Sequence, residues 1–131
     1  MVKSGYLVDT DVIINYLKGK SKSKDFFMKI INGNAAGYFS VITEAELLSG
    51  VRGDKEKAAI YDVLDIMEAI EVERQMAVTA GNLRRKYIAH GAQLPDALIA
   101  ATAKERKLIV ATGNEKHFKL FDEIEKEYVK E

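Results

Sequence analysis

The sequence predicts an α/β protein: a three-layer α/β/α sandwich around a central, mostly parallel sheet of four to five strands. Short apolar segments alternate along the chain with stretches of helical spacing, which is the order of βαβ units. Two of these segments, YLV at 6–8 and LIVAT at 108–112, are continuously apolar, as strands buried on both faces should be. The length of 131 residues suits a core of ordinary size, and we expect one domain over residues 1–131.

The first half of the chain is predicted to hold two strands and four helices. In order these are strand 5–8, helix 12–18, a helix through 26–31, strand 37–43, helix 44–51 and helix 55–67. Apolar residues can share one face of the first helix, and the NGN segment at 32–34 stops the second. The segment KGKSKSKD at 18–25 is predicted to be a basic turn between them. Four aromatic residues are assigned to the core: Phe26, Phe27, Tyr38 and Phe39.

The second half repeats the alternation. Its predicted elements are strand 69–73, helix 76–90, a helix that opens at 95 and strand 108–112. Gly91 is a natural C-terminal stop, and Pro95 is suited to a first helical turn. The segment after His117 fits helix, strand or both in turn.

Composition excludes several classes of protein. Lysine plus arginine and aspartate plus glutamate number 20 each, so bulk charge gives no argument for nucleic-acid or membrane binding. There is no cysteine, which removes disulfides and thiolate metal sites and fits a reducing compartment. No apolar run approaches the roughly 20 residues that span a bilayer, and no signal peptide is visible. We expect a soluble, cytoplasmic protein without a membrane partner.

Acidic and polar residues follow the predicted strands where they end. Asp9 comes directly after the first strand, and a buried carboxylate there is costly unless something pairs with it. It is either a turn residue or part of a metal site, whereas Asp11 is suited to capping the following helix. Because parallel sheets bind ligands beyond the carboxyl ends of their strands, we expect a site near Asp9 and Asn114.

Two further candidates lie on helices. Glu44 and Glu46 are about 200° apart on a helix, so one pocket cannot receive both. Helical periodicity does not choose between them, and Thr43 with Glu46 also fits a capping box. Asp96 lies at the rim of the apolar segment ALIAATA, where an acid faces a pocket as readily as it complements the helix dipole.

Oxygen donors dominate this set of candidates. His117 has no second histidine at metal-ligand spacing and is interpreted as a partly exposed structural residue. Carboxylates without thiols or paired imidazoles indicate a hard cation, Mg²⁺ or Mn²⁺. Several carboxylates that converged without a cation would repel one another, and some would be forced to protonate.

Four segments together resemble the PIN-domain family, specifically the VapC-type ribonuclease toxins of toxin–antitoxin pairs. They occur in the family's order and are LVDTDVII, SVITEAELLSG, PDALIAATA and IVATGNEKHF, within residues 7–118. The resemblance implies an acidic site of Asp9, Glu46 and Asp96, and it selects Glu46 over Glu44. At a fourth position, where PIN domains often carry aspartate, this chain has Asn114.

The resemblance also implies roles for these residues. Asp9 and Asp96 would hold Mg²⁺ or Mn²⁺, Glu46 would be a ligand or orient the attacking water, and Asn114 would ligate or orient through its amide. Asp11 or Glu115 are the candidates to replace the missing fourth charge. Hydroxyl groups at three positions would support the acids: Thr10, Thr43 and Thr112.

The activity implied is that of a metal-dependent endoribonuclease. Cations must hold the RNA because an acidic pocket repels phosphate, and the candidates are KGKSKSK at 18–24 and Arg84, Arg85 and Lys86. The implied partners are RNA, a small VapB-like antitoxin and a second copy of the chain in a homodimer.

Two alternatives from other classes stay open at this point. LVDTDVI also fits the opening motif of haloacid-dehalogenase-like phosphatases, in which Asp9 would be the nucleophile and Asp11 the acid/base. The chain lacks the late acid pair that those enzymes need after LIVATGN. The other alternative is a PIN-like module that binds RNA or protein without cleaving.

Overall fold

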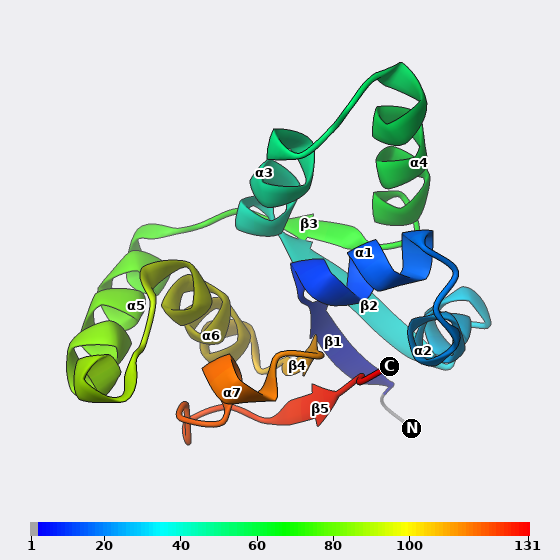
Figure 1. Cartoon of the computed structure of the whole chain (residues 1–131). Helices are drawn as coiled ribbons and strands as arrows, with labels where there is room; N and C mark the ends of the chain where they lie inside the picture. Colours follow the sequence, from blue (N-terminus) through cyan, green and yellow to red (C-terminus); the bar gives the residue numbers. More distant parts are fainter. Residues whose placement is uncertain (1–2) are drawn as a thin grey trace.

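A computed structural model describes residues 3–131, and its core is a five-stranded sheet in the order β3-β2-β1-β4-β5 (Figure 1). All four strand pairs are parallel. The strands are β1 Ser4–Val8, β2 Ala35–Ser40, β3 Glu68–Ile70, β4 Ile109–Thr112 and β5 Lys126–Tyr128. The predicted α/β sandwich is confirmed, with every strand parallel.

Helices cover both faces of the sheet and bury two cores. They are α1 Thr10–Leu17, α2 Ser21–Ile31, α3 Val41–Ser49, α4 Asp54–Leu64, α5 Arg74–Tyr87, α6 Leu94–Arg106 and α7 Glu115–Phe118, with a 3₁₀ helix at Ile88–His90. The first four pack on one face and the others on the opposite face (Figure 1). Within β1, Val8 faces the first core and Leu7 the second, and both are fully buried. This two-sided burial explains the continuously apolar strands.

Three predictions about where helices begin are wrong. The second strand ends at Ser40 rather than at residue 43, because the Ser40 hydroxyl accepts a hydrogen bond from the Ile42 N–H (3.1 Å) and caps α3. Thr43 therefore lies inside α3, and it forms no capping box with Glu46. Asp9, not Asp11, caps α1.

Other boundaries differ by smaller amounts. Much of the predicted basic turn at 18–25 is helical, since α2 begins at Ser21. The predicted helix 55–67 ends at Leu64, and strand 69–73 covers only Glu68–Ile70. The helix predicted to reach residue 90 divides into α5 and the 3₁₀ helix, which stops at Gly91 with a φ of 88°. The ambiguous segment after His117 supplies only the last residue of α7, Phe118, and then forms β5.

The chain crosses the sheet once between its two halves. Strands β1, β2 and β3 lie side by side in chain order, from the centre of the sheet to one edge. The chain then returns through α5 and α6 and adds β4 on the other side of β1. The connections that leave β1 and β4 thus diverge, which opens a crevice at their carboxyl ends. The fold places its binding crevice there.

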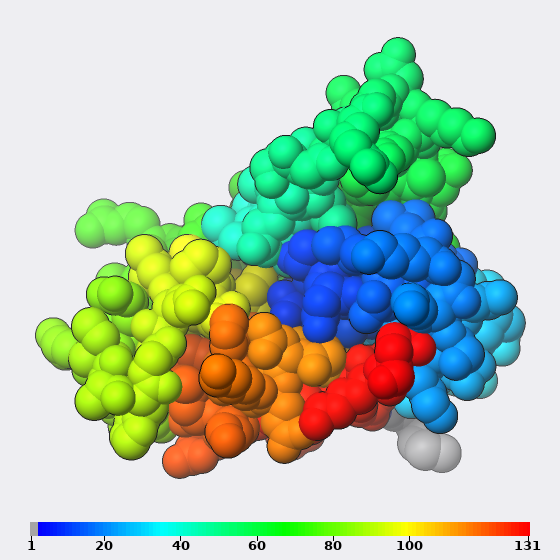
Figure 2. Space-filling model, in the orientation of Figure 1, coloured from blue at the N-terminus to red at the C-terminus, as the bar shows by residue number. Residues whose placement is uncertain are grey.

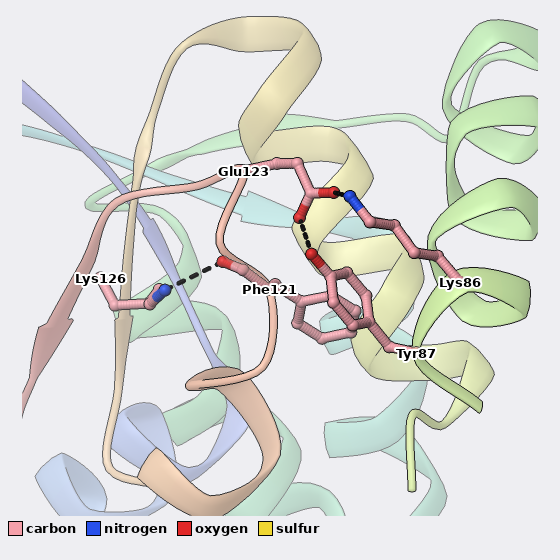
Figure 3. A network of polar contacts seen from close by, with 5 residues as sticks. All are labelled: Lys86, Tyr87, Phe121, Glu123 and Lys126. Carbon is pink, nitrogen blue, oxygen red and sulfur yellow. Dashed lines mark hydrogen bonds and ion pairs between the residues drawn. The ribbon is translucent and has the colours of Figure 1, made fainter. Parts of the chain in front are cut away.

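Two features of the outer surface complete the description. Helices α3 and α4 project from the body as an upright pair (Figures 1 and 2). Beside β5, Glu123 lies between Lys86 and Tyr87 of α5 (Figure 3). Over residues 3–131, no helix is long and apolar enough to cross a membrane.

Candidate active site at the switch point of the sheet

A cavity of about 300 Å³ lies at the carboxyl ends of β1 and β4. It is lined by the β1–α1 connection, α3, the start of α6 and the β4–α7 connection. Its lining residues are Asp9, Thr10, Asp11, Ile14, Glu46, Gln93, Pro95, Asp96, Ile99, Asn114 and His117. The four residues that the sequence resemblance assigns to catalysis therefore border one cavity: Asp9, Glu46, Asp96 and Asn114.

Asp9 is held by two neutral donors. Its Oδ1 accepts from the Thr10 N–H at 2.9 Å, and its Oδ2 accepts from the Thr112 hydroxyl at 2.8 Å. Thr112 ends β4, and its Oγ1 also accepts from the Asn114 N–H at 3.0 Å. One threonine thus fixes Asp9 and the loop that carries Asn114.

Glu46 and Glu44 point to different places, as their helical separation predicted. The Thr10 hydroxyl donates to Oε1 of Glu46 at 2.7 Å. Glu44 instead accepts from the Tyr61 hydroxyl at 2.7 Å, outside the cavity lining. The expectation that threonines support the acids fits Thr10 and Thr112, whereas the buried Thr43 hydroxyl has no partner.

Asp96 has a partner that the sequence did not reveal. Nδ1 of His117 lies 3.1 Å from Oδ2 of Asp96, and both side chains line the cavity. The one available signal was the spacing between Asn114 and His117, since residues three apart in a helical turn lie on the same side.

Asp11 connects α1 to the β4–α7 loop. Its Oδ2 accepts from the Gly113 N–H at 2.9 Å, while its Oδ1 is buried without a hydrogen-bond partner. The approach is so close that a Cβ atom at position 113 would lie 2.6 Å from Oδ2. Glu115, the other candidate for the missing charge, pairs with Lys130 and is not part of the lining.

The electrostatics of the cavity disfavour ionised acids. Burial, together with the charge of Asp11, raises the pKa of Asp9 to about 7, although the hydrogen bonds from Thr112 and Thr10 act in the opposite direction. Burial also raises the pKa of Asp11. The pKa of Asp96 is raised by burial and by the charge of Glu46, against the lowering effect of His117. Among residues 3–131, no cationic side chain offsets this effect at Asp9 or Asp11, and Asp96 has only His117.

The donor set fits a hard divalent cation. As placed, no three acidic or histidine side chains within residues 3–131 converge closely enough to hold an ion. The cavity nevertheless presents carboxylate and amide oxygens, the ligands that Mg²⁺ and Mn²⁺ prefer. The unpartnered Oδ1 of Asp11 and the raised pKa of Asp9 both indicate a place where positive charge would be favourable.

A second cavity of about 480 Å³ adjoins the first and shares Ile14 and Glu46 with it. It runs between α1, α3 and α4, and its basic lining residues are Lys18 and Arg52. Of the other basic candidates, Lys86 pairs with Glu123 at 2.8 Å and Arg85 bonds to Asn82. Lys18 is therefore the cation of the predicted basic segments that lies nearest to this site.

Known proteins that are similar to this chain belong to one family. A profile of the PIN domain matches residues 6–124. Ribonuclease VapC10 of Mycobacterium tuberculosis is 32% identical over 120 residues, which cover 90% of this chain and 89% of that protein.

Solved structures agree with the same fold. VapBC2 from Rickettsia felis, bound to a promoter DNA fragment, superposes with a TM-score of 0.81 at 21% identity and covers 95% of this chain and 98% of that one. DNA-bound VapBC from Salmonella typhimurium gives a TM-score of 0.80 at 25% identity and covers 97% and 98%.

The fold and the matched profile define the chain as a member of the PIN-domain family. Within that family it belongs to the VapC-type toxin ribonucleases, as the resemblance predicted. This membership favours the nuclease over the phosphatase alternative.

Proposed function

We propose that this chain is the toxin of a toxin–antitoxin pair and cleaves RNA phosphodiester bonds internally with Mg²⁺ or Mn²⁺. The observation that carries the proposal is the single cavity at the switch point of the sheet, which Asp9, Glu46 and Asp96 line together. These three acids come from three segments that are distant in sequence, and the chain's curated relatives are ribonucleases.

In this proposal Asp9 and Asp96 hold the cation. When bound, the cation would lower the pKa of a water molecule and neutralise charge that develops on the phosphate oxygens. Thr112 keeps Oδ2 of Asp9 oriented, and Thr10 does the same for Oε1 of Glu46. Glu46 is a third ligand or accepts a proton from the attacking water, since its carboxylate borders the same cavity.

Asn114 contributes an amide rather than a charge. Its backbone N–H is fixed by Thr112, so its side chain is presented at the wall of the cavity. A neutral residue here leaves fewer negative charges around a cation, which favours one ion over two. Asp11 is the nearest acid that could increase that charge.

The chain's partners follow from its relatives and from the second cavity. Solved neighbours are VapBC toxin–antitoxin complexes, and we expect a small VapB-like antitoxin to cover the cavity beside the acids. Lys18 in its lining would otherwise be available to RNA phosphates, whereas Arg52 pairs with Glu56 at 3.1 Å. We further expect a homodimer.

The test is RNA cleavage by the purified chain with Mg²⁺, with Mn²⁺ and with a chelator. Asp9→Asn, Glu46→Gln and Asp96→Asn should each abolish cleavage and keep the thermal unfolding transition. Glu44→Gln is the matched control, because Glu44 is two residues from Glu46 on the same helix but contacts Tyr61 outside the cavity.

Cleavage that persists in chelator, or in the three acid variants, would overturn the proposal. RNA binding that the chelator does not change, without cleavage in any divalent metal, would instead identify the non-cleaving binding module.

A further inference from the structure

Each of the three acids in the proposed site faces a side-chain donor, and these three side chains come from different elements. Thr112 of β4 donates to Asp9, Thr10 of α1 donates to Glu46, and the third donor belongs to α7, where His117 faces Asp96. Partners of this kind fix the orientation of metal-binding carboxylates. The first two donors are hydroxyl groups, and the third is an imidazole.

We propose that His117 is a positioning residue for the reaction: its Nδ1–H donates to Oδ2 of Asp96 and leaves Oδ1 as the oxygen that meets the cation. This inference rests on the proposed function. It assigns a role to a residue that the sequence presents as an ordinary structural histidine.

The distance and burial support a directed contact. Nδ1 of His117 and Oδ2 of Asp96 are 3.1 Å apart, and the Asp96 side chain is only 19% exposed. Among the side chains of residues 3–131, His117 is the one that pairs with this carboxylate within hydrogen-bonding distance. The contact therefore restrains the orientation of Asp96, which lies in the first turn of α6.

The backbone of α7 fixes the imidazole. The N–H groups of His117 and of Phe118 both approach the Asn114 carbonyl at 3.2 Å. The Phe118 ring is fully buried and packs 6.0 Å from the Phe121 ring, centroid to centroid. A single helical turn anchored in the core therefore directs His117 toward the cavity.

The role does not depend on whether the imidazole is charged. Nδ1 carries a hydrogen in the imidazolium and in one neutral tautomer, and in both forms it can donate to the Asp96 carboxylate at the observed distance of 3.1 Å.

The experiment compares two substitutions at this position. In His117→Asn, the amide nitrogen can occupy the place of Nδ1 and keep the donor, whereas His117→Leu keeps the bulk and removes it. His90→Leu is the control, since His90 is the chain's other histidine and is exposed on the 3₁₀ helix outside the cavity lining. The readouts are the dissociation constant for Mn²⁺, measured by calorimetric titration, and kcat/KM for RNA cleavage.

We expect His117→Leu to weaken Mn²⁺ binding and kcat/KM by about 10-fold or more, the usual effect of removing a ligand's supporting partner. His117→Asn should stay within about 3-fold of the wild type on the same scale, and His90→Leu should match the wild type. If His117→Leu does not fold, His117→Gln replaces it, because a glutamine amide falls where Nε2 lies.

Several results would overturn the inference. Equal losses in the Asn and Leu variants would show that the ring acts through its size, and tighter Mn²⁺ binding by the Leu variant would show that His117 competes with the cation. A Leu variant that matches the wild type would overturn this inference alone. A wild-type chain that neither binds Mn²⁺ nor cleaves RNA would overturn the proposed function together with it.

Discussion

Asp9 at the crevice and Glu123 beside α5 are both partly buried carboxylates with two hydrogen-bond donors. Asp9 accepts from Thr10 and Thr112 at 2.9 and 2.8 Å, and Glu123 accepts from Lys86 and Tyr87 at 2.8 Å each (Figure 3). Their pKa values nevertheless move in opposite directions. The pKa of Asp9 rises to about 7, while that of Glu123 is lowered.

The difference is the charge around each group. Burial acts to raise the pKa of Glu123 as well, but the Lys86 ammonium and the Tyr87 hydroxyl outweigh it. Asp9 has neutral donors and faces the acids Asp11 and Asp96. Glu123 has its own cation in Lys86, whereas Asp9 and Asp11 lie together in the crevice without one from the part of the chain that the structure describes. That contrast is what a site for an external cation requires.

The largest expected effect is the difference in RNA cleavage between a variant at the crevice and a variant at the paired carboxylate. Asp9→Asn should reduce RNA cleavage by more than about 100-fold, beyond what loss of a mere supporting partner costs. Glu123→Gln, the equivalent change at the paired carboxylate, should leave cleavage unchanged. Single-turnover cleavage in Mn²⁺ measures both. Similar losses in the two variants would contradict the distinction between the regions.

The second effect is on stability against pH in the presence of a chelator. The ordinary pKa of aspartate is 3.8, and burial raises that of Asp9 to about 7 in the folded state. Between these values the folded state binds more protons than the unfolded state, so the free energy of unfolding should fall as pH rises from about 4 to about 7 and then level off.

At about 1.4 kcal/mol for each pH unit, the upper limit of this fall is about 4 kcal/mol. Urea unfolding at pH 5 and pH 8 captures about two of these pH units, or about 3 kcal/mol at most, and Asp9→Asn should remove most of the difference. Mn²⁺ should restore stability at pH 8 by binding the folded state. An identical pH dependence in the wild type and the variant would show that Asp9 ionises normally.

The third effect concerns two buried threonines. Thr112→Val removes the donor to Asp9 and the acceptor of the Asn114 N–H, so we expect a loss of about 1–2 kcal/mol in unfolding free energy and about 10-fold in cleavage. Thr43→Val is the control, since the Thr43 hydroxyl is buried without a partner and its removal should be neutral or stabilising. Denaturant unfolding that ranks the two variants in the reverse order would refute the assignment.

The smallest effect is at the paired carboxylate. Glu123→Gln keeps an acceptor for Tyr87 but loses the charge that faces Lys86. The Lys86 side chain is 62% exposed, so the unfolding free energy should fall by only about 0.5 kcal/mol, within the range of exposed ion pairs. The loss should shrink in concentrated salt. A loss of unfolding free energy that is the same in low and high salt would show that Glu123→Gln acts through packing and not through charge.

Much of the fold was predictable because hydrophobic periodicity reports burial. The segments 6–8 and 108–112 were recognisable as central strands since both of their faces are covered. The end of β2 was not recognisable, because Val41 and Ile42 continue the apolar run into α3, and only the Ser40 cap marks the boundary.

The sequence predicted that Asp9, Glu46 and Asp96 would lie together, and they border one cavity, but it did not predict the side chains that contact them. Sequence periodicity left Glu44 and Glu46 undecided, and the family resemblance selected the one that borders the cavity. The contact between Thr112 and Asp9 depends on β4 pairing with β1, and the position of His117 depends on how Phe118 anchors α7. Thr112 and Asp9 are about a hundred residues apart in sequence, and His117 and Asp96 are about twenty apart. A local sequence pattern does not predict contacts across such separations.

The order in which the chain is synthesised matters for a protein of this class. Asp9 directly follows β1 and is made early in translation, but the neighbouring strand β4 ends at Thr112 and the last wall of the cavity includes His117. A ribosome therefore makes nearly the whole polypeptide before the two walls can meet. The cavity is therefore incomplete on the nascent chain until this C-terminal segment has been made.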